Sequence, residues 1–353
     1  MTSRRDFLKH TALAGLAAAM SRPAFAVTLT RTGMAQTVLG PLDAGKLGFT
    51  LPHEHVSDAP AVLPRWPQAW GGKAAFVAKA IERLKFVRAA GVGAIVDLTP
   101  YDVGRDIQFL EEASRQSGLT MIASTGQRFF PPASPVAMPA HTIEGLAAFF
   151  RKEIEQGIDG TQVKAGVIKI GIVGKEPTAL EEIGLRAAAR ASKATGVPTR
   201  THTNAARRAG ESHAVILEEE GIEPARVSFD HSDDSGDMDY FLGLARRGYS
   251  LGMDHVHRGM SPDFKPPFER RAECIKLLAA AGFAGKIFLS QDSEFGGSLL
   301  PADKREWRET IDPPDGLLFG PRRLIPHLKQ IGVSNHDIHT MTVENPRGFF
   351  SLV

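Results

Sequence analysis

Short apolar runs of the kind that form β-strands alternate along this chain with stretches whose apolar residues recur at helical spacing. The runs predict eight strands, at residues 48–53, 94–99, 120–125, 165–171, 198–202, 227–231, 249–253 and 286–291. The stretches between and after them predict helices at residues 73–90, 104–117, 143–157, 178–195, 208–220, 236–247, 267–282 and 321–331. Thr178 and Glu181 form a capping-box pattern at the start of the fourth helix, and Gly196 marks its end.

This repeated alternation, with no break in composition, favours one α/β domain, a single parallel (β/α)8 TIM barrel, over two domains. The alternative is an open doubly wound sheet, which would need a glycine-rich phosphate turn after its first strand. The segment at that place, PHEHVSDAP at residues 52–60, contains no glycine. We therefore expect one barrel over residues 27–353, with its functional site at the C-terminal ends of the strands.

Residues 1–26 differ in character from the rest of the chain. Arg4 and Arg5 precede a weakly apolar stretch that ends in AFA at residues 24–26, a small-x-small cleavage pattern. This pattern is typical of a twin-arginine export signal, so we expect a periplasmic protein; an ordinary amphipathic helix is the alternative. No apolar segment reaches the roughly 20 residues that cross a bilayer, and we expect no transmembrane segment.

Charge and cysteine content narrow the class of protein further. The chain has a formal net charge of +2 and is close to neutral once residues 1–26 are set aside, with no long basic block. Nucleic-acid binding is therefore disfavoured. Cys274 is the only cysteine, so no intrachain disulfide can form, and we expect it to be a small buried apolar residue.

A polar residue of a metal-binding type stands at the end of several predicted strands. In a parallel barrel these ends meet at one rim, where imidazole and carboxylate groups could bind a metal such as zinc. Strand alternation also places His231 in phase with Val227 and Phe229, so we expect all three side chains to point inward. The strand-end residues are His53 and His55 (first strand), His202 (fifth), His231 (sixth), His255 (seventh) and Asp292 (eighth).

Lys169, on the fourth predicted strand, does not fit a simple ligand set. A cation would repel a metal ion, and burying it unpaired inside a barrel costs several kcal/mol. Carboxylation of its amine by CO₂ would convert it to an anionic carbamate with two oxygens for two metals. The residues alone leave two alternatives open, a lysine paired with Asp292 or one that reaches solvent at the rim.

The order of these residues resembles that of the bacterial phosphotriesterases (aryldialkylphosphatases), within the binuclear-metal amidohydrolase superfamily. The resemblance begins at TVLGPLDAGKLGFTLPHEHV, continues through IVDLTPYDVGRD, AGVIKI, TRTHT, HSDD, GMDH and LSQD, and ends at VENPRGFFS. It implies a zinc-dependent hydrolase of organophosphate triesters, a small-molecule substrate, and a homodimer. It also implies two zinc or other divalent ions per subunit.

The resemblance further implies a ligand set for each metal. The more buried ion would be bound by His53, His55 and Asp292, the more exposed ion by His202 and His231, and both would be bridged by N6-carboxylated Lys169 and a hydroxide.

Two further groups of residues follow from the same resemblance. Asp292 would take the proton of the hydroxide and pass it through His255 to Asp234. Arg128 could hold an anionic or carbonyl-bearing substrate, or face solvent. The substrate pocket would include Tyr101, Val103, Arg128, Phe129 and Arg258, with His257 at its rim.

Two other functions are compatible with parts of this pattern. A lactonase, for instance of acyl-homoserine lactones, would use the same binuclear site. A non-catalytic periplasmic binding protein would have kept the barrel and lost the chemistry, but all six expected metal positions are present. The remaining histidines after the export signal are expected at the surface or in packing: His141, His213, His327, His336 and His339.

Overall fold

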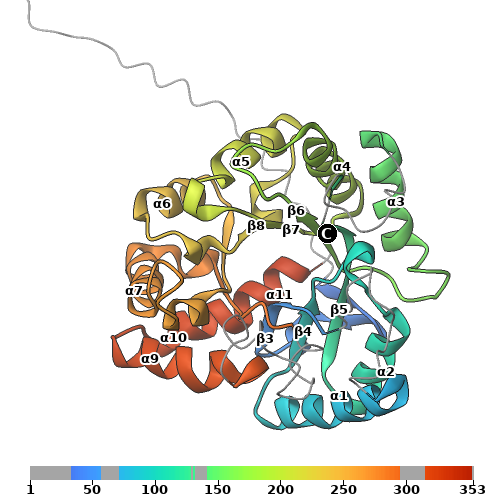
Figure 1. Cartoon of the computed structure of the whole chain (residues 1–353), viewed down its shortest axis with the longest axis horizontal. Helices are drawn as coiled ribbons and strands as arrows, with labels where there is room; N and C mark the ends of the chain where they lie inside the picture. The colour runs from blue at the N-terminus through green and yellow to red at the C-terminus, as the bar shows by residue number, and fades with distance from the viewer. Residues whose placement is uncertain (1–32, 57–70, 129, 132–140, 295–314, 352–353) are drawn as a thin grey trace, which may run out of the picture. The chain divides into compact units, whose positions relative to one another are not determined.

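The centre of the fold is a sheet of eight parallel strands in chain order (Figure 1). The computed structural model describes residues 33–56, 71–128, 130–131, 141–294 and 315–351. All eight predicted strands are confirmed. They are β3 (Thr50–Glu54), β4 (Ala94–Asp97), β5 (Thr120–Gln127), β6 (Val167–Gly171), β7 (Thr199–His202), β8 (Val227–Asp230), β9 (Ser250–Met253) and β10 (Ile287–Leu289).

Helices follow the strands and surround them, which confirms the expected (β/α)8 barrel (Figure 1). The capping box of Thr178 and Glu181 is present at the start of α4. The α-helix predicted at 267–282 ends at Leu278 and passes into a π-helical turn at Ala279–Phe283, inside which Gly282 takes a φ of 86°. The helices are α1 (Gly72–Ala89), α2 (Ile107–Ser117), α3 (Ile143–Glu155), α4 (Ala179–Thr195), α5 (Gly210–Glu219), α6 (Met238–Arg246), α7 (Phe268–Leu278), α9 (Ile325–Gln330), α10 (Asn335–His339) and α11 (Asn345–Phe350).

Alternate residues of the strands belong to two separate apolar cores. Ile95 and Ile168 pack with residues of the surrounding helices. Val96 and Val167 belong instead to a smaller cluster with Phe288, which fills the inside of the barrel. Lys169 is in phase with Val167 on β6 and therefore points inward.

A short antiparallel hairpin precedes the barrel, and the sequence pattern did not predict it. It consists of β1 (Met34–Thr37) and β2 (Gly40–Asp43). Ala35 of β1 packs in the inner cluster together with Phe349 and Phe350 of α11. Both ends of the described chain therefore contribute to the inner core.

Hydrogen bonds join the end of β3 to the segment that follows β10, which brings distant parts of the sequence together. The N–H of Asp292 donates to the carbonyl of His53 (3.1 Å), and the N–H of His55 donates to the carbonyl of Ser293 (3.0 Å). These bonds set the two histidines beside Asp292 at the C-terminal edge of the sheet.

The segment of residues 1–26, expected to be an export signal, lies outside the described residues, and the described barrel lies within the predicted 27–353. None of the described helices combines the length and apolar character that a membrane crossing requires.

Candidate metal centre

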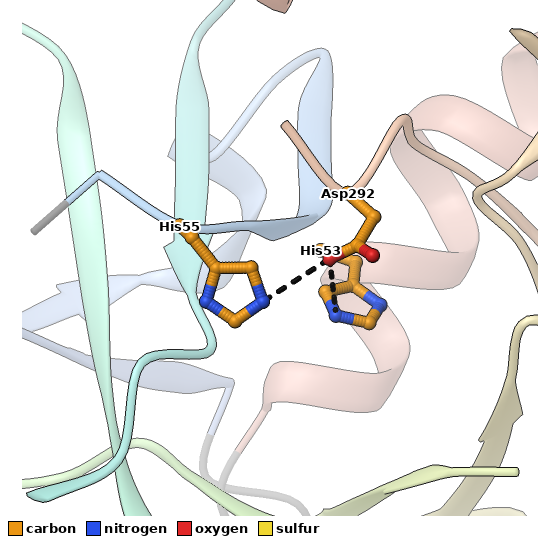
Figure 2. A group of neighbouring side chains, drawn as sticks. All are labelled: His53, His55 and Asp292. Carbon is orange, nitrogen blue, oxygen red and sulfur yellow. Dashed lines mark ion pairs between the residues drawn. The ribbon is translucent and has the colours of Figure 1, made fainter. Parts of the chain in front are cut away.

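His53, His55 and Asp292 form one group of converging ligand atoms (Figure 2). Nε2 of His53 lies 3.2 Å, and Nε2 of His55 lies 3.1 Å, from the same oxygen, Oδ1 of Asp292. Ligands that bind one zinc ion tetrahedrally at about 2.0–2.1 Å are about 3.3 Å apart, so these three atoms fit one metal. Burial tends to raise the pKa of Asp292, but His53 and other neighbours hold it well below its usual range, as an ionised ligand requires.

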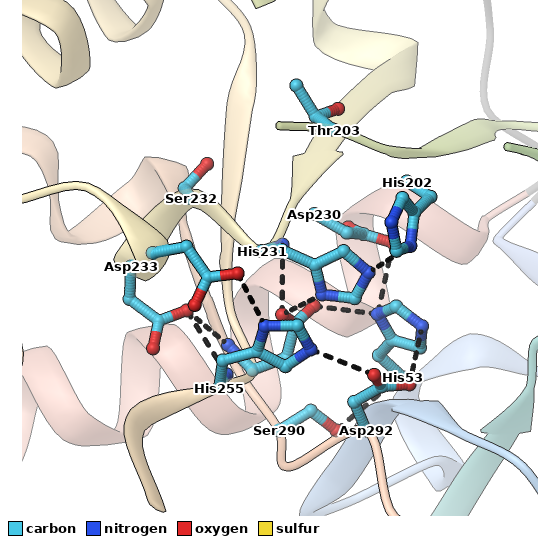
Figure 3. Close-up of polar contacts among 12 residues, drawn as sticks. His53, His202, Thr203, Asp230, His231, Ser232, Asp233, His255, Ser290 and Asp292 are labelled. Atoms are coloured by element: carbon cyan, nitrogen blue, oxygen red, sulfur yellow. Dashed lines mark hydrogen bonds and ion pairs between the residues drawn. The ribbon is translucent and has the colours of Figure 1, made fainter. Parts of the chain in front are cut away.

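His202 and His231 face each other next to this group (Figure 3). Nδ1 of His202 and Nε2 of His231 are 2.7 Å apart, a distance at which one ring donates to the other. Burial is the main cause that lowers the pKa of both rings, to about 3 for His231 and well below its usual value for His202. Neutral imidazoles have the free nitrogen that a metal needs, and a metal ion would take the place of the proton they share.

Lys169 is buried between these groups. Its Nζ lies 3.1 Å from Nε2 of His53 and donates to Oδ2 of Asp230 at 3.2 Å. The alternatives of pairing with Asp292 or of reaching solvent are wrong, because the side chain is 1% exposed and its carboxylate contact is Asp230. Burial lowers the pKa of the amine, which favours the neutral form that reacts with CO₂. Its carboxylation stays a prediction.

Asp230 and Arg200 form a buried ion pair inside the barrel that the sequence did not predict. The guanidinium of Arg200 donates from Nη2 to Oδ1 of Asp230 at 2.7 Å and from Nε to Oδ2 at 3.1 Å. The same Oδ2 accepts the contact from Lys169. The pair therefore fixes the carboxylate that holds the lysine amine.

The side chain of His231 points into the site because of its backbone conformation, not because of strand alternation. Ser228 donates to Asp230 within β8, so these two residues share the inward face, whereas Val227 and Phe229 pack in the outer core. The prediction that Val227 and Phe229 point inward is wrong. The strand ends at Asp230, and His231 has a φ of 59°, a left-handed conformation that turns its side chain into the site.

Asp254 orients one histidine of each candidate metal group, and sequence reasoning missed it. Its Oδ2 contacts Nδ1 of His53 at 2.6 Å, and its Oδ1 contacts Nδ1 of His231 at 2.8 Å. A carboxylate on one ring nitrogen fixes the tautomer and directs the other nitrogen to a metal. The signal that could have found it is its place one residue before His255, in the GMDH segment.

His255 joins Asp292 to Asp234 in a chain of contacts. Its Nε2 lies 2.9 Å from Oδ2 of Asp292, and its Nδ1 lies 2.8 Å from Oδ2 of Asp234, whose side chain is 31% exposed. Burial is the largest effect and lowers the pKa of His255, but Asp234 and Asp292 outweigh it and raise the pKa to about 9. The imidazole is therefore protonated at neutral pH and links a ligand candidate to a partly exposed carboxylate.

Two expected pocket residues lie directly beside the ligand candidates. Nη2 of Arg128, which follows β5, lies 3.1 Å from Nε2 of His202. Nη2 of Arg258, in the turn after β9, donates to Oδ2 of Asp292 at 3.2 Å.

For the other three expected pocket residues, the structure supports a pocket role less directly. Tyr101 and Val103 flank Asp102, whose carboxylate accepts the backbone N–H of Arg128 at 3.0 Å. The ring of Tyr101 packs against Phe149 of α3. Phe129 lies outside the described residues. A pocket role for Tyr101 and Val103 stays a prediction.

The histidines expected at the surface or in packing are found there. His213 is buried, and His327 packs against Phe268. His257 is buried with its ring against Phe319, and Cys274 is buried as expected. The exposed members are His141, His336 and His339.

The model of the Phosphotriesterase family matches residues 33–350. The chain belongs to this family. A phosphotriesterase homology protein of Mycobacterium tuberculosis is 35% identical over 321 residues, which cover 89% of this chain and 96% of that protein. An aryldialkylphosphatase of Saccharolobus solfataricus is 32% identical over 317 residues, covering 88% and 97%.

A solved structure agrees with these relatives. The phosphotriesterase from Mycobacterium tuberculosis superimposes with a TM-score of 0.77 at 34% identity, covering 90% of this chain and 98% of that one. The expected family and fold are confirmed. Membership in the phosphotriesterase family makes the chain a metal-dependent hydrolase that acts on esters, of a kind that uses a binuclear metal site.

The contacts of Asp254 predict an effect on metal affinity. In Asp254→Asn one oxygen becomes an amide donor, so either His53 or His231 loses its acceptor. We expect metal affinity to fall about 10- to 100-fold. Competition with a chromogenic chelator would measure this, with the exposed Asp263→Asn as the matched control. An unchanged affinity at the same fold stability would contradict the orienting role.

Proposed function

We propose that this chain hydrolyses phosphotriesters with two zinc ions held by the predicted ligand set. The observation that supports this most strongly is the convergence of five histidine and aspartate ligand candidates and one buried lysine at a single rim. In this proposal His53, His55 and Asp292 hold one ion, and His202 and His231 hold the other.

Lys169 would complete both coordination spheres as an N6-carboxylated residue. An ammonium group 3.1 Å from Nε2 of His53 would oppose a cation at that nitrogen, whereas a carbamate would attract it. After carboxylation one N–H remains on the lysine, and Oδ2 of Asp230 lies within reach to accept it. When bound, the two ions would lower the pKa of the attacking water and polarise the oxygen of the ester.

The residues of the chain would then move the proton that the water loses. Asp292 would accept it on the oxygen that faces His255. His255, already protonated at neutral pH, would release its Nδ1 proton to Asp234 and then take the new proton at Nε2, and Asp234, which is partly exposed, would deliver its proton to solvent. Arg271 donates to Oδ1 of Asp234 at 2.8 Å, which keeps the final acceptor in place. None of these steps depends on whether phosphorus or carbon is attacked, so a lactone is the second candidate substrate.

Metal content and ester preference test this proposal together. The full chain should bind about two zinc ions, lose its activity on chelation and regain it with zinc. Paraoxon and a lactone panel, compared by kcat/KM, would separate the two substrate classes. Lactone turnover more than about tenfold higher would reverse the order of the candidates. Failure of the zinc-loaded protein on every ester would favour the non-catalytic binding protein.

The proton chain predicts a specific defect for His255→Ala. We expect metal content to stay the same and kcat to fall by about 10- to 1,000-fold, because the proton of Asp292 loses its acceptor. Elemental analysis and steady-state kinetics would measure both. Loss of metal in this variant would show that His255 is a ligand and not part of a relay.

We also propose, from the sequence alone, that the chain is exported to the periplasm by the twin-arginine route. The motif around Arg4 and Arg5 supports this. Cell fractionation of an Arg4→Lys, Arg5→Lys double variant should find precursor retained in the cytoplasm, and unchanged export would contradict the proposal. Homodimerisation stays a prediction.

A further inference from the structure

The ion pair of Asp230 and Arg200 lies next to Lys169 inside the barrel. Both oxygens of Asp230 accept hydrogen bonds from the guanidinium of Arg200, and Oδ1 also accepts from the hydroxyl of Ser228 at 3.0 Å. Cζ of Arg200 lies 4.9 Å from the centre of the Phe288 ring in the inner core. Both side chains of the pair are 0% exposed. The carboxylate is therefore fixed in place, and its charge is compensated by the guanidinium.

The neighbouring strand leaves room for this carboxylate. Gly252 lies on β9, beside β8, and a β-carbon at its position would be 2.7 Å from Oδ1 and 3.0 Å from Cα of Asp230. Packed atoms of this kind do not approach so closely, so a larger residue at 252 would displace the carboxylate. Asp230 therefore occupies a place that β9 keeps open for it.

Asp230 meets two of the candidate metal ligands through one oxygen. Its Oδ2 accepts from Nζ of Lys169 at 3.2 Å and lies 3.2 Å from Nδ1 of His53. Both neighbours of Nδ1 are carboxylates, Asp230 and Asp254, so Nδ1 carries the proton of the ring and leaves Nε2 for a metal. The oxygen therefore accepts from the back of two groups whose other side faces the metal site.

Carboxylation of Lys169 changes the charge that Asp230 faces. The lone pair of Nζ forms a bond to the carbon of CO₂, one C=O bond pair becomes a charge on oxygen, and one proton leaves the nitrogen for solvent. A neutral amine becomes an anion that keeps one N–H. A carboxylate without a counter-charge, 3.2 Å from that nitrogen, would repel the new anion. Asp230 paired with Arg200 offers an acceptor for the N–H and adds no net negative charge.

We propose that Asp230 and Arg200 are positioning residues for carboxylated Lys169. Asp230 accepts its N–H, which fixes the orientation of the planar carbamate, and Arg200 cancels the charge of Asp230. In this role both residues act through Lys169, and neither binds a metal. The inference rests on the carboxylation in the proposed function and adds the residues that stabilise it.

The dependence of carboxylation on bicarbonate tests the role of the charge. Zinc is added to the metal-free full chain in CO₂-depleted buffer with increasing ¹³C-bicarbonate, and the ¹³C signal of the carbamate is followed by NMR. We expect Arg200→Met to need at least about tenfold more bicarbonate for half of the maximal signal, because Asp230 then repels the carbamate. Adding Asp230→Asn to this variant removes the second charge and should bring the requirement back to within about threefold of the wild type.

A matched pair of double variants tests the hydrogen bond. Asparagine and leucine have nearly the same shape, but only asparagine has an acceptor oxygen. In the Arg200→Met background, we expect Asp230→Leu to need about tenfold more bicarbonate than Asp230→Asn, because the buried N–H loses its acceptor. Neither double variant leaves one charge of the pair behind, so this comparison holds even where Arg200→Met alone does not fold. Arg115→Met, which breaks an exposed ion pair of α2, is the control and should match the wild type.

The outcomes separate this inference from the proposed function. A wild type that binds zinc and gives no carbamate signal would reject the carboxylation and the positioning roles together. A carbamate that forms with the same bicarbonate dependence in the wild type and in all three variants of the pair would keep the carboxylation and reject the positioning roles alone. Equal requirements in the two double variants would overturn the role of Asp230 as acceptor. A defect of Arg200→Met that Asp230→Asn does not relieve would overturn the charge role of Arg200.

Discussion

The site depends on closure of the barrel between β3 and β10, and the buried carboxylate of Glu54 provides that closure. Glu54 accepts hydrogen bonds from the hydroxyl of Ser290 (2.6 Å) and from the backbone N–H groups of Gln291 (3.2 Å) and Ser293 (2.9 Å). These donors bracket Asp292, which has a φ of 46°, a left-handed conformation that a residue other than glycine rarely adopts. Because Glu54 holds both neighbouring N–H groups, Asp292 stays aimed at the histidines.

The remaining geometry follows from the need to pair every buried charge. A buried carboxylate stays ionised only when hydrogen bonds or cations compensate it. Burial raises the pKa of Glu54 to about 8, which its three donors offset only in part, whereas two other buried carboxylates are paired with cations or imidazoles. Asp254 lies between two imidazoles, and Asp230 lies between Lys169 and Arg200. These pairings also serve the metal site, because the groups that compensate the charges orient the candidate ligand atoms.

Much of this site could be predicted from the sequence because its residues lie at the ends of the apolar runs that mark the strands. Apolar runs mark the strands, and a parallel barrel brings their ends to one rim, so His53, His55 and His202 could be placed without coordinates. The role of Glu54 could not be predicted, since it depends on partners from a distant strand. Asp254 is marked by its place before His255, but the two histidines it contacts are not evident from the sequence. His231 was placed in the site by an argument that fails, because a left-handed residue breaks the alternation.

Residues that would hold the metal differ in position from residues that would contact the substrate. A ligand at a strand end is held by the hydrogen bonds of the barrel, so its position is set by the fold. Arg128 and Arg258 lie just beyond the strands, in the segments that vary in barrels of this type while the strands are kept. A metal centre fixed by the strands can therefore serve different esters in proteins that differ just beyond the strands.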